Sequence, residues 1–254
     1  MKQLYYSLPQ YLKDTFGRKL YKVALETGMT CPNRDGKVAV GGCIFCGEGG
    51  SGDFAIYYEG KRLSREELIY NHQEIPKGDY IAYFQSFTNT YAPTSKLREI
   101  FTAALEDDLF AGISIATRPD CLGKDVIELL KELKEKYLNK FIWVELGLQT
   151  IHESTAKWMN RGYPLEVFDE AIKNLKAIHI EVIVHIIIGL PGEDQKMMLE
   201  TIEHLNACQI DGVKLQLLHY LKNTRLGVQY LLNPSQYHVL EMDEYVELVT
   251  ECIA

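Results

Sequence analysis

Residues 181–193 read EVIVHIIIGLPGE, and this stretch decides the fold class. The apolar residues at 182–184 and 186–188 are all β-branched and show no polar alternation, which is typical of a parallel strand covered on both faces. Gly189 ends the run, and a helical pattern begins at Glu193. A strand that leads directly into a helix is the repeating unit of an α/β protein.

The same unit recurs along the whole chain. Apolar runs predict strands at 20–25, 80–84, 112–116, 141–148, 181–188 and 212–218. Amphipathic patterns predict helices at 64–72, 94–105, 124–137, 165–178, 193–208 and 242–253. Six strand–helix units in one series predict an α/β fold, a partial (β/α)6 TIM-like barrel of parallel strands. The loops after the strands then emerge on one face, where such barrels carry their chemistry.

The composition is that of a globular protein. The chain has 254 residues, 46% hydrophobic and 24% charged, which excludes disordered, collagen-like and coiled-coil chains. We expect one domain over 1–254. The longest apolar run, 182–190, is too short to span a bilayer, and the first residues, MKQLYYSLPQYLKD, lack the apolar core of a signal peptide. A cytoplasmic protein with no membrane segment is expected, and because the chain stops inside a helical pattern we also expect a missing C-terminal extension.

The formal charge is −8, which argues against binding nucleic acid through bulk charge. Residues 1–38 are nevertheless basic, with seven Lys and Arg against three acidic residues. The basic N-terminal segment 1–19 interleaves cations with aromatic rings, as RNA-binding surfaces do. Two bland alternatives stay open: a solvated basic surface, and rings that only seal one end of the barrel.

Three of the six cysteines lie in one long glycine-rich loop, 27–61, which follows the first predicted strand. They are Cys31, Cys43 and Cys46, in the string CPNRDGKVAVGGCIFC. Structural zinc needs four protein ligands, commonly two pairs, and no second CxxC is present. An iron–sulfur cube on three cysteines leaves one iron open for a substrate. Unligated thiols or a distorted zinc knuckle are the alternatives.

This cysteine string resembles the motif of the radical SAM superfamily, in which an aromatic residue, here Phe45, precedes the last cysteine. Eleven residues separate Cys31 from Cys43, where most of the superfamily has three. Longer gaps occur in the YhcC-like group and in relatives of the elongator catalytic subunit. The strings YFQSFTNTYAP, TRPDCL, ELGLQT, NRGY and GLPGE also resemble the YhcC-like group. The resemblance implies that Cys31, Cys43 and Cys46 hold a catalytic [4Fe–4S] cluster that binds S-adenosylmethionine (SAM) at its open iron.

The resemblance also implies a set of SAM-binding positions near the strand ends. These are Phe45, Gln85, Ser86, Thr117, Glu145, Gln149, Arg161, His185 and Gly189. Gln149 and Arg161 have the spacing of a pair that holds the ribose and the SAM carboxylate, and a planar guanidinium suits a carboxylate. Five of these positions have a plainer interpretation: ordinary loop chemistry for Gln85 and Ser86, a structural ion pair for Glu145 and Arg161, and a satisfied core residue for His185.

Several other polar side chains lie near the same face. Pro119 keeps Arg118 extended, so that it either reaches across the barrel mouth or forms a surface salt bridge. Cys121 is a candidate hydrogen-atom donor or ligand, with a buried inert thiol as the plainer reading. Lys214 and Gln216 share one face of the last strand, which points either inward to a substrate or outward to solvent.

The resemblance to the elongator catalytic subunit suggests a tRNA wobble uridine as substrate, with a flavodoxin- or ferredoxin-type protein as reductant. One alternative is a radical SAM enzyme that acts on a small metabolite or a protein side chain. Another is a non-catalytic iron–sulfur or zinc module that binds a partner.

Overall fold

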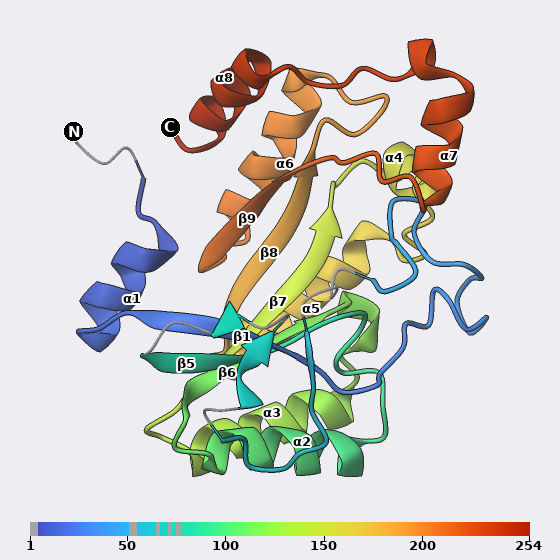
Figure 1. Ribbon diagram of the computed structural model, residues 1–254. Helices are drawn as coiled ribbons and strands as arrows, with labels where there is room; N and C mark the ends of the chain where they lie inside the picture. The colour runs from blue at the N-terminus through green and yellow to red at the C-terminus, as the bar shows by residue number, and fades with distance from the viewer. Residues whose placement is uncertain (1–4, 51–54, 65–66, 71–72, 75–77) are drawn as a thin grey trace.

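The computed structural model describes residues 5–50, 55–64, 67–70, 73–74 and 78–254. Its centre is a seven-stranded sheet in the order β2-β1-β5-β6-β7-β8-β9, with every neighbouring pair parallel (Figure 1). The strands are β1 (Leu20–Glu26), β2 (Ile56–Tyr57), β5 (Asp79–Phe84), β6 (Phe110–Thr117), β7 (Phe141–Gln149), β8 (Glu181–Ile188) and β9 (Gly212–Leu217). The six predicted strands are confirmed, and β2 adds a short edge strand within the long loop. The α/β, partial-barrel prediction is confirmed.

From β5 onward, helices separate the successive strands of the parallel sheet. They are α1 (Leu8–Phe16), α2 (Thr94–Glu106), α3 (Lys124–Lys136), α4 (Glu153–Trp158), α5 (Leu165–Ala177), α6 (Gln195–Ala207), α7 (Arg225–Leu232) and α8 (Met242–Cys252). Short 3₁₀ turns follow at η2 (Pro119–Cys121) and η3 (Pro234–Gln236). In Figure 1, α2 and α3 lie along one side of the curved sheet. No helix within the described residues is long and apolar enough to cross a membrane.

The helix expected at 64–72 is wrong where the structure describes it. Ile69–Tyr70 forms β3, which pairs antiparallel with β4, Gln73–Glu74. Positions 65–66 and 71–72 lie outside the described residues. Three short helices, α1, α4 and α7, were not predicted. For α1 the chain does carry signals, because Ser7 caps its start and Gly17, with φ 67°, ends it.

The main core lies between the outer face of the sheet and the helices. On β8, Val182, Val184, Ile186 and Ile188 are buried while the alternate residues are partly exposed. The expectation that this run is covered on both faces is therefore wrong. One face packs against helices, and the other turns toward the barrel interior, which holds polar groups.

Helix α1 closes the amino-terminal end of the barrel. Leu12 packs with Ile81 and Trp143 there, and the Tyr11 ring lies 5.9 Å from that of Trp143. The Tyr11 hydroxyl donates to Glu181 Oε1 over 2.7 Å. Leu12 and Tyr11 therefore seal one end of the barrel, as one of the two plainer alternatives stated. This end is opposite to the end that carries the cysteine loop.

Candidate active site at the carboxyl ends of the strands

The cysteine loop is fastened to two neighbouring segments. The amide of Ile44 donates to Met159 O, just after α4, and the amide of Leu226 at the start of α7 donates to Ile44 O. Arg225 and Asn160 both donate to Gly42 O. Figure 1 shows the loop running beside α4 and α7. The CxxC segment is thus held in place by backbone contacts on both sides.

Two side chains donate hydrogen bonds to the thiols. Asn33 Nδ2 lies 3.5 Å from Cys43 Sγ, and an Arg34 guanidinium nitrogen lies 3.5 Å from Cys46 Sγ. Burial is the main cause that raises the pKa of the Cys43 thiol to about 11; Arg118 acts to lower this pKa, and Cys46 and Cys31 act to raise it. The three thiols and a cationic side chain therefore face a common space.

The spacing of these sulfur atoms bears on which metal centre they fit. Among the described residues, only Asp169, His204 and Cys208 bring three ligand atoms within 4.8 Å of one another, so at least one pair of the three loop thiols lies farther apart than this. Tetrahedral zinc with Zn–S bonds near 2.3 Å needs sulfurs about 3.8 Å apart. Three cysteine thiols set wider than this fit a multi-iron cluster better than a single zinc ion.

The segment after β5 closes over the start of the cysteine loop. The amide of Gln85 donates to Leu25 O, and that of Thr88 donates to Thr30 O. Asn89 Nδ2 donates to both Ser86 O, over 2.9 Å, and Ala116 O, over 3.0 Å. Asn89 thus joins the loops after β5 and β6. It lay in the quoted run YFQSFTNTYAP, but only the fold shows that it fixes two strand ends.

Two buried polar atoms beside this segment have no protein partner. They are Thr88 Oγ1 and Asn33 Oδ1, from neighbouring loops. A buried unpaired acceptor costs about 1–3 kcal/mol unless another group satisfies it. These two atoms therefore point to a bound group that the polypeptide alone does not supply.

The carboxyl end of β6 carries Thr117 and Arg118. Thr117 Oγ1 lies 2.6 Å from Thr90 Oγ1, which also donates to Cys121 O. Arg118 is only 9% exposed and donates through Nε and Nη2 to both oxygens of Asp120, over 2.9 and 2.7 Å. Arg118 thus forms a buried ion pair and also donates through Nη1 to Arg161 O over 2.9 Å, so neither predicted alternative describes it fully.

Glu145 is the centre of a polar network inside the barrel. It is 1% exposed and accepts hydrogen bonds from Lys22, Ser114 and His185, the last over 2.7 Å. Burial alone raises the pKa of Glu145, but the hydrogen bond from His185 and the charge of Lys22 outweigh it and hold that pKa well below its usual range. Burial lowers the pKa of His185, against the raising effect of Glu145. The partner expected for Glu145 is present, and His185 is a satisfied residue that faces the barrel interior.

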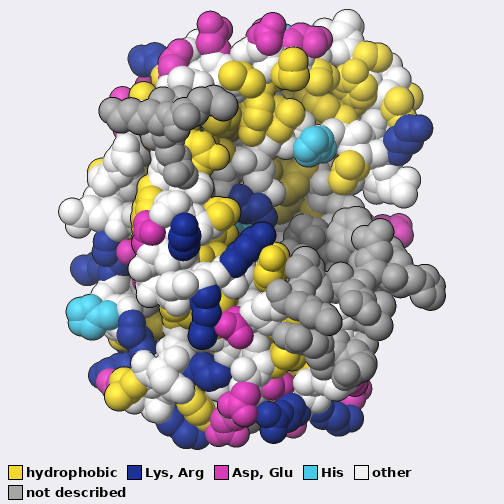
Figure 2. Space-filling view, turned by 60° about the vertical axis from the view of Figure 1, so that its left-hand side comes forward, with side chains coloured by type: hydrophobic (Ala, Val, Ile, Leu, Met, Phe, Trp, Pro, Cys, Tyr) yellow, Lys and Arg dark blue, Asp and Glu magenta, His cyan; other side chains and the backbone are white. Residues whose placement is uncertain are grey.

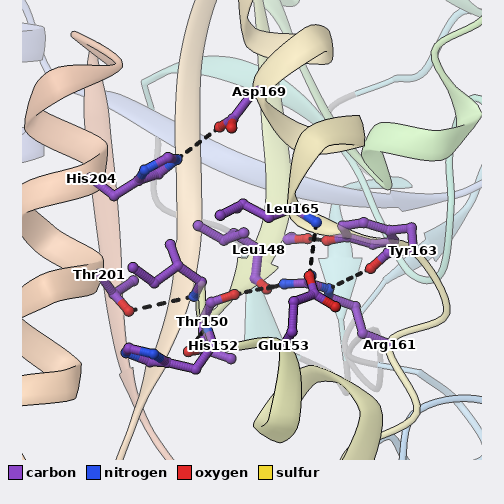
Figure 3. Close-up of polar contacts among 12 residues, drawn as sticks. Leu148, Thr150, His152, Glu153, Arg161, Tyr163, Leu165, Asp169, Thr201 and His204 are labelled. Atoms are coloured by element: carbon purple, nitrogen blue, oxygen red, sulfur yellow. Dashed lines mark hydrogen bonds and ion pairs between the residues drawn. The ribbon is translucent and has the colours of Figure 1, made fainter.

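Gln149 is the last residue of β7, and the Arg161 side chain contacts the same strand end. Gln149 has a φ of 67°, and the pairing with β8 shifts register there. Arg161 is 1% exposed and donates to Tyr163 O, Leu148 O, Thr150 O and Glu153 Oε1 over 2.6–3.2 Å (Figure 3). Four of its five N–H groups thus have protein partners, which favours the structural ion-pair alternative for Arg161.

The GLPGE turn after β8 borders a cleft of about 440 Å³. Gly189 has a φ of 84° and lies against Leu240, while Gly192 faces open space. Glu193 accepts a hydrogen bond from Thr150 Oγ1 over 2.6 Å, which ties the turn to the end of β7. The turn therefore presents backbone to the cleft from a fixed position.

The remaining predicted positions divide between interior and surface. Lys214 is exposed, and it pairs in register with His185, so its side chain lies on the same side of the sheet as that of His185. Figure 2, turned toward the side that carries α1 and β9, shows Lys and Arg side chains across the middle of the face and hydrophobic ones above them.

Burial raises the pKa of Cys121 to about 12, as for an inert thiol. His219 is exposed.

Three of the seven basic residues in 1–38 have polar partners within the protein. Arg18 pairs with Asp79 over 2.7 Å, Lys22 with Glu145, and Arg34 donates to carbonyls at Cys46 and Glu48. This arrangement favours the plainer reading of the basic charge in this region.

Comparison with known proteins defines the class. Residues 26–205 match the family model of the Radical SAM superfamily, and the chain belongs to that superfamily. Its cofactors are accordingly a [4Fe–4S] cluster and SAM, and the donor set of three cysteines fits the cluster.

Individual relatives narrow the placement. The chain is 46% identical to the uncharacterized protein YtqA of Bacillus subtilis, over 97% of this chain and 76% of that one. It is 33% identical to YhcC of Escherichia coli, over 95% and 76%. Over 54% of the chain it is 28% identical to a tRNA uridine(34) acetyltransferase of Methanocaldococcus jannaschii, and covers 25% of that protein.

A solved structure shares the fold. The Elp3 protein of Methanocaldococcus infernus superposes with a TM-score of 0.63 at 17% identity, over 92% of this chain and 53% of that one. The chain thus spans about half of that protein. The resemblance to the YhcC-like group and, more distantly, to the elongator catalytic subunit is confirmed.

Proposed function

We propose that this chain is a radical SAM enzyme that modifies the side chain of a tRNA wobble uridine. The observation that carries the enzymatic part is the loop of Cys31, Cys43 and Cys46, fixed at the carboxyl ends of the strands with Asn33 and Arg34 donating to the sulfurs. When bound, the cluster supplies the electron that cleaves SAM to methionine and a 5′-deoxyadenosyl radical. A small flavodoxin- or ferredoxin-type protein is the proposed reductant, in the cytoplasm.

The chain's own residues fall into two roles in this proposal. Six residues on the strand ends and their loops bind SAM through side-chain or backbone groups: Phe45, Gln85, Ser86, Thr117, Gln149 and Gly189. Glu145, Arg161 and His185 act by positioning, because each already has several protein partners. The orphaned Thr88 Oγ1 and Asn33 Oδ1 supply further polar contacts to a bound group. Arg118 places positive charge beside the thiolates, which favours their ionised form.

The tRNA substrate rests on the relatives rather than on a basic surface. The tRNA uridine(34) acetyltransferase matches over half of the chain, and a wobble base in a loop can be turned into a pocket. The polar interior around Lys22 and Glu145 offers both donors and acceptors to such a base. The basic N-terminal segment contributes less than expected, because α1 lies at the opposite end of the strands.

The first experiment measures 5′-deoxyadenosine. Protein is purified and reconstituted without oxygen, given SAM and dithionite, and compared with Cys43→Ala and with the control Cys252→Ala on α8. Product from the wild type and the control but not from Cys43→Ala supports radical chemistry. No product from protein with a full cluster, with or without added tRNA, contradicts it.

The substrate is tested separately by nucleoside analysis of bulk tRNA from cells with and without the gene. Loss of one modified uridine is expected. An unchanged profile beside intact 5′-deoxyadenosine formation refutes the tRNA substrate alone and favours a small metabolite or a protein side chain.

A further inference from the structure

Three metal-ligating side chains meet on the outer helix layer, away from the cysteine loop. They are Asp169 of α5, His204 of α6, and Cys208, which caps the end of α6. Their ligand atoms all lie within 4.8 Å of one another. His204 Nε2 is 2.7 Å from Asp169 Oδ1, and Cys208 Sγ is 3.9 Å from the same oxygen. Figure 3 shows Asp169 and His204 pointing toward each other across the two helices.

The local sequence explains why two of the three ligands share a face. His204 and Cys208 are four residues apart, and positions i and i+4 of a helix lie on one side, one turn apart. Asp169 comes from the neighbouring helix and completes a triangle. The donor set of one nitrogen, one sulfur and one oxygen joins two helices, and Asp169 and His204 are 35 residues apart in the chain.

The electrostatics leave this triangle open to a cation. Within the described residues, the only ion pair of Asp169 is with His204, and no Lys or Arg pairs with it. The ammonium of Lys176, at the end of α5, donates instead to the carbonyls of Cys208 and Gln209. The side chains of His204 and Asp169 are 25% and 43% exposed, so an ion and a water molecule can reach them.

We propose that Asp169, His204 and Cys208 bind a Zn²⁺ ion that fastens α5 to α6. Nitrogen, sulfur and carboxylate ligands are those that zinc takes, and three protein ligands leave a fourth position for water. Tetrahedral zinc needs ligand atoms about 3.3–3.8 Å apart, which the Cys208–Asp169 pair nearly meets. The His204–Asp169 contact opens by about half an ångström to admit the ion. Binding releases the thiol proton of Cys208 to solvent, and His204 binds as neutral imidazole through Nε2 with its one ring proton on Nδ1.

The test uses full-length protein in which Cys31, Cys43 and Cys46 are replaced by Ala, so that the loop site is silent. Titration with Co²⁺, which reports thiolate ligation by a charge-transfer band, is expected to saturate at one ion per chain. Adding Cys208→Ser abolishes the band, and His204→Gln weakens binding at least about tenfold. Adding Cys252→Ser, which removes a thiol on α8, leaves the band intact.

A second measurement covers the case in which the triple variant does not fold. Wild-type protein with a reconstituted cluster is equilibrated with Zn²⁺, desalted and assayed for zinc by elemental analysis. One zinc per chain is expected, lost in Cys208→Ser and kept in Cys252→Ser. Zinc content that is equal in the two variants, or a charge-transfer band that survives Cys208→Ser, overturns the proposal.

Discussion

His185 on β8 donates from Nε2 to Oε2 of Glu145 on β7 over 2.7 Å, inside the barrel. Lys22 and Ser114 donate to the other oxygen of the same carboxylate. Four strands, β1, β6, β7 and β8, thus contribute to one buried acidic group. The charge is tolerated because its hydrogen bonds and the Lys22 ammonium replace the water that burial removes.

Replacing Glu145 with Gln tests this network. The variant leaves Lys22 without its charge partner, and we expect the free energy of unfolding at neutral pH to fall by about 3 kcal/mol. The pKa of Glu145 is lower in the folded than in the unfolded chain, so its stabilisation is complete above the unfolded value. It is lost as the pH falls below the usual 4.5 toward the folded value.

Urea unfolding from pH 7 to pH 3 measures both effects. The difference in unfolding free energy between wild type and Glu145→Gln is expected to become smaller as the pH falls. The exposed control Glu128→Gln on α3 is expected to have nearly the same unfolding free energy as wild type at every pH. A difference that stays constant with pH would refute the charged state assigned to Glu145.

Arg161 is expected to act chiefly through structure. Arg161→Ala removes the donor to the carbonyls of Leu148 and Thr150 and leaves Glu153 without its charge partner, and we expect a loss of about 3 kcal/mol in unfolding free energy. Arg161→Lys recovers only part of it, because an ammonium cannot span the same oxygens.

The matched control is Arg98→Ala, which removes an exposed ion pair with Glu132 and costs at most about 1 kcal/mol. Chemical denaturation measures all three variants. If Arg161→Ala and Arg98→Ala both lower the unfolding free energy by the same small amount, the buried contacts of Arg161 do not stabilise the fold.

Gly162 controls the position of Asn33 beside Cys43. It has a φ of 84°, and an added Cβ lies 2.7 Å from Asn33 Oδ1, closer than real contacts allow. Gly162→Ala therefore displaces Asn33, which donates to the Cys43 sulfur, and we expect less iron retained per chain after reconstitution.

Gly41→Ala separates this contact from backbone strain. Gly41 has a similar φ of 80° within the cysteine loop, but nothing lies within 4 Å of an added Cβ. Iron assays on both variants are expected to show the larger loss for Gly162→Ala. Equal losses would assign the effect to strain in the left-handed backbone.

The sequence by itself determined the alternation of strands and helices, the parallel sheet and the cysteine loop. Strands that pack against helices have apolar, commonly β-branched residues at regular intervals. This pattern is visible in the sequence, so it predicts the strands directly. Cys31, Cys43 and Cys46 lie close together in the sequence, so they predict a metal centre before the fold is known. The sequence did not predict the short helices α1, α4 and α7 or the strands β3 and β4, because such short segments contain few periodic positions.

Only the tertiary structure decided which partners the polar residues have. Glu145 meets Lys22 across 123 positions of sequence, and Asp169 meets His204 across 35. Arg161 has the spacing of a ligand-binding residue, yet the fold surrounds it with carbonyl oxygens. Hydrogen bonds and charges act over a few ångströms in space, whereas a sequence records only distance along the chain, so the role of each charged side chain is fixed by the packing of the strands.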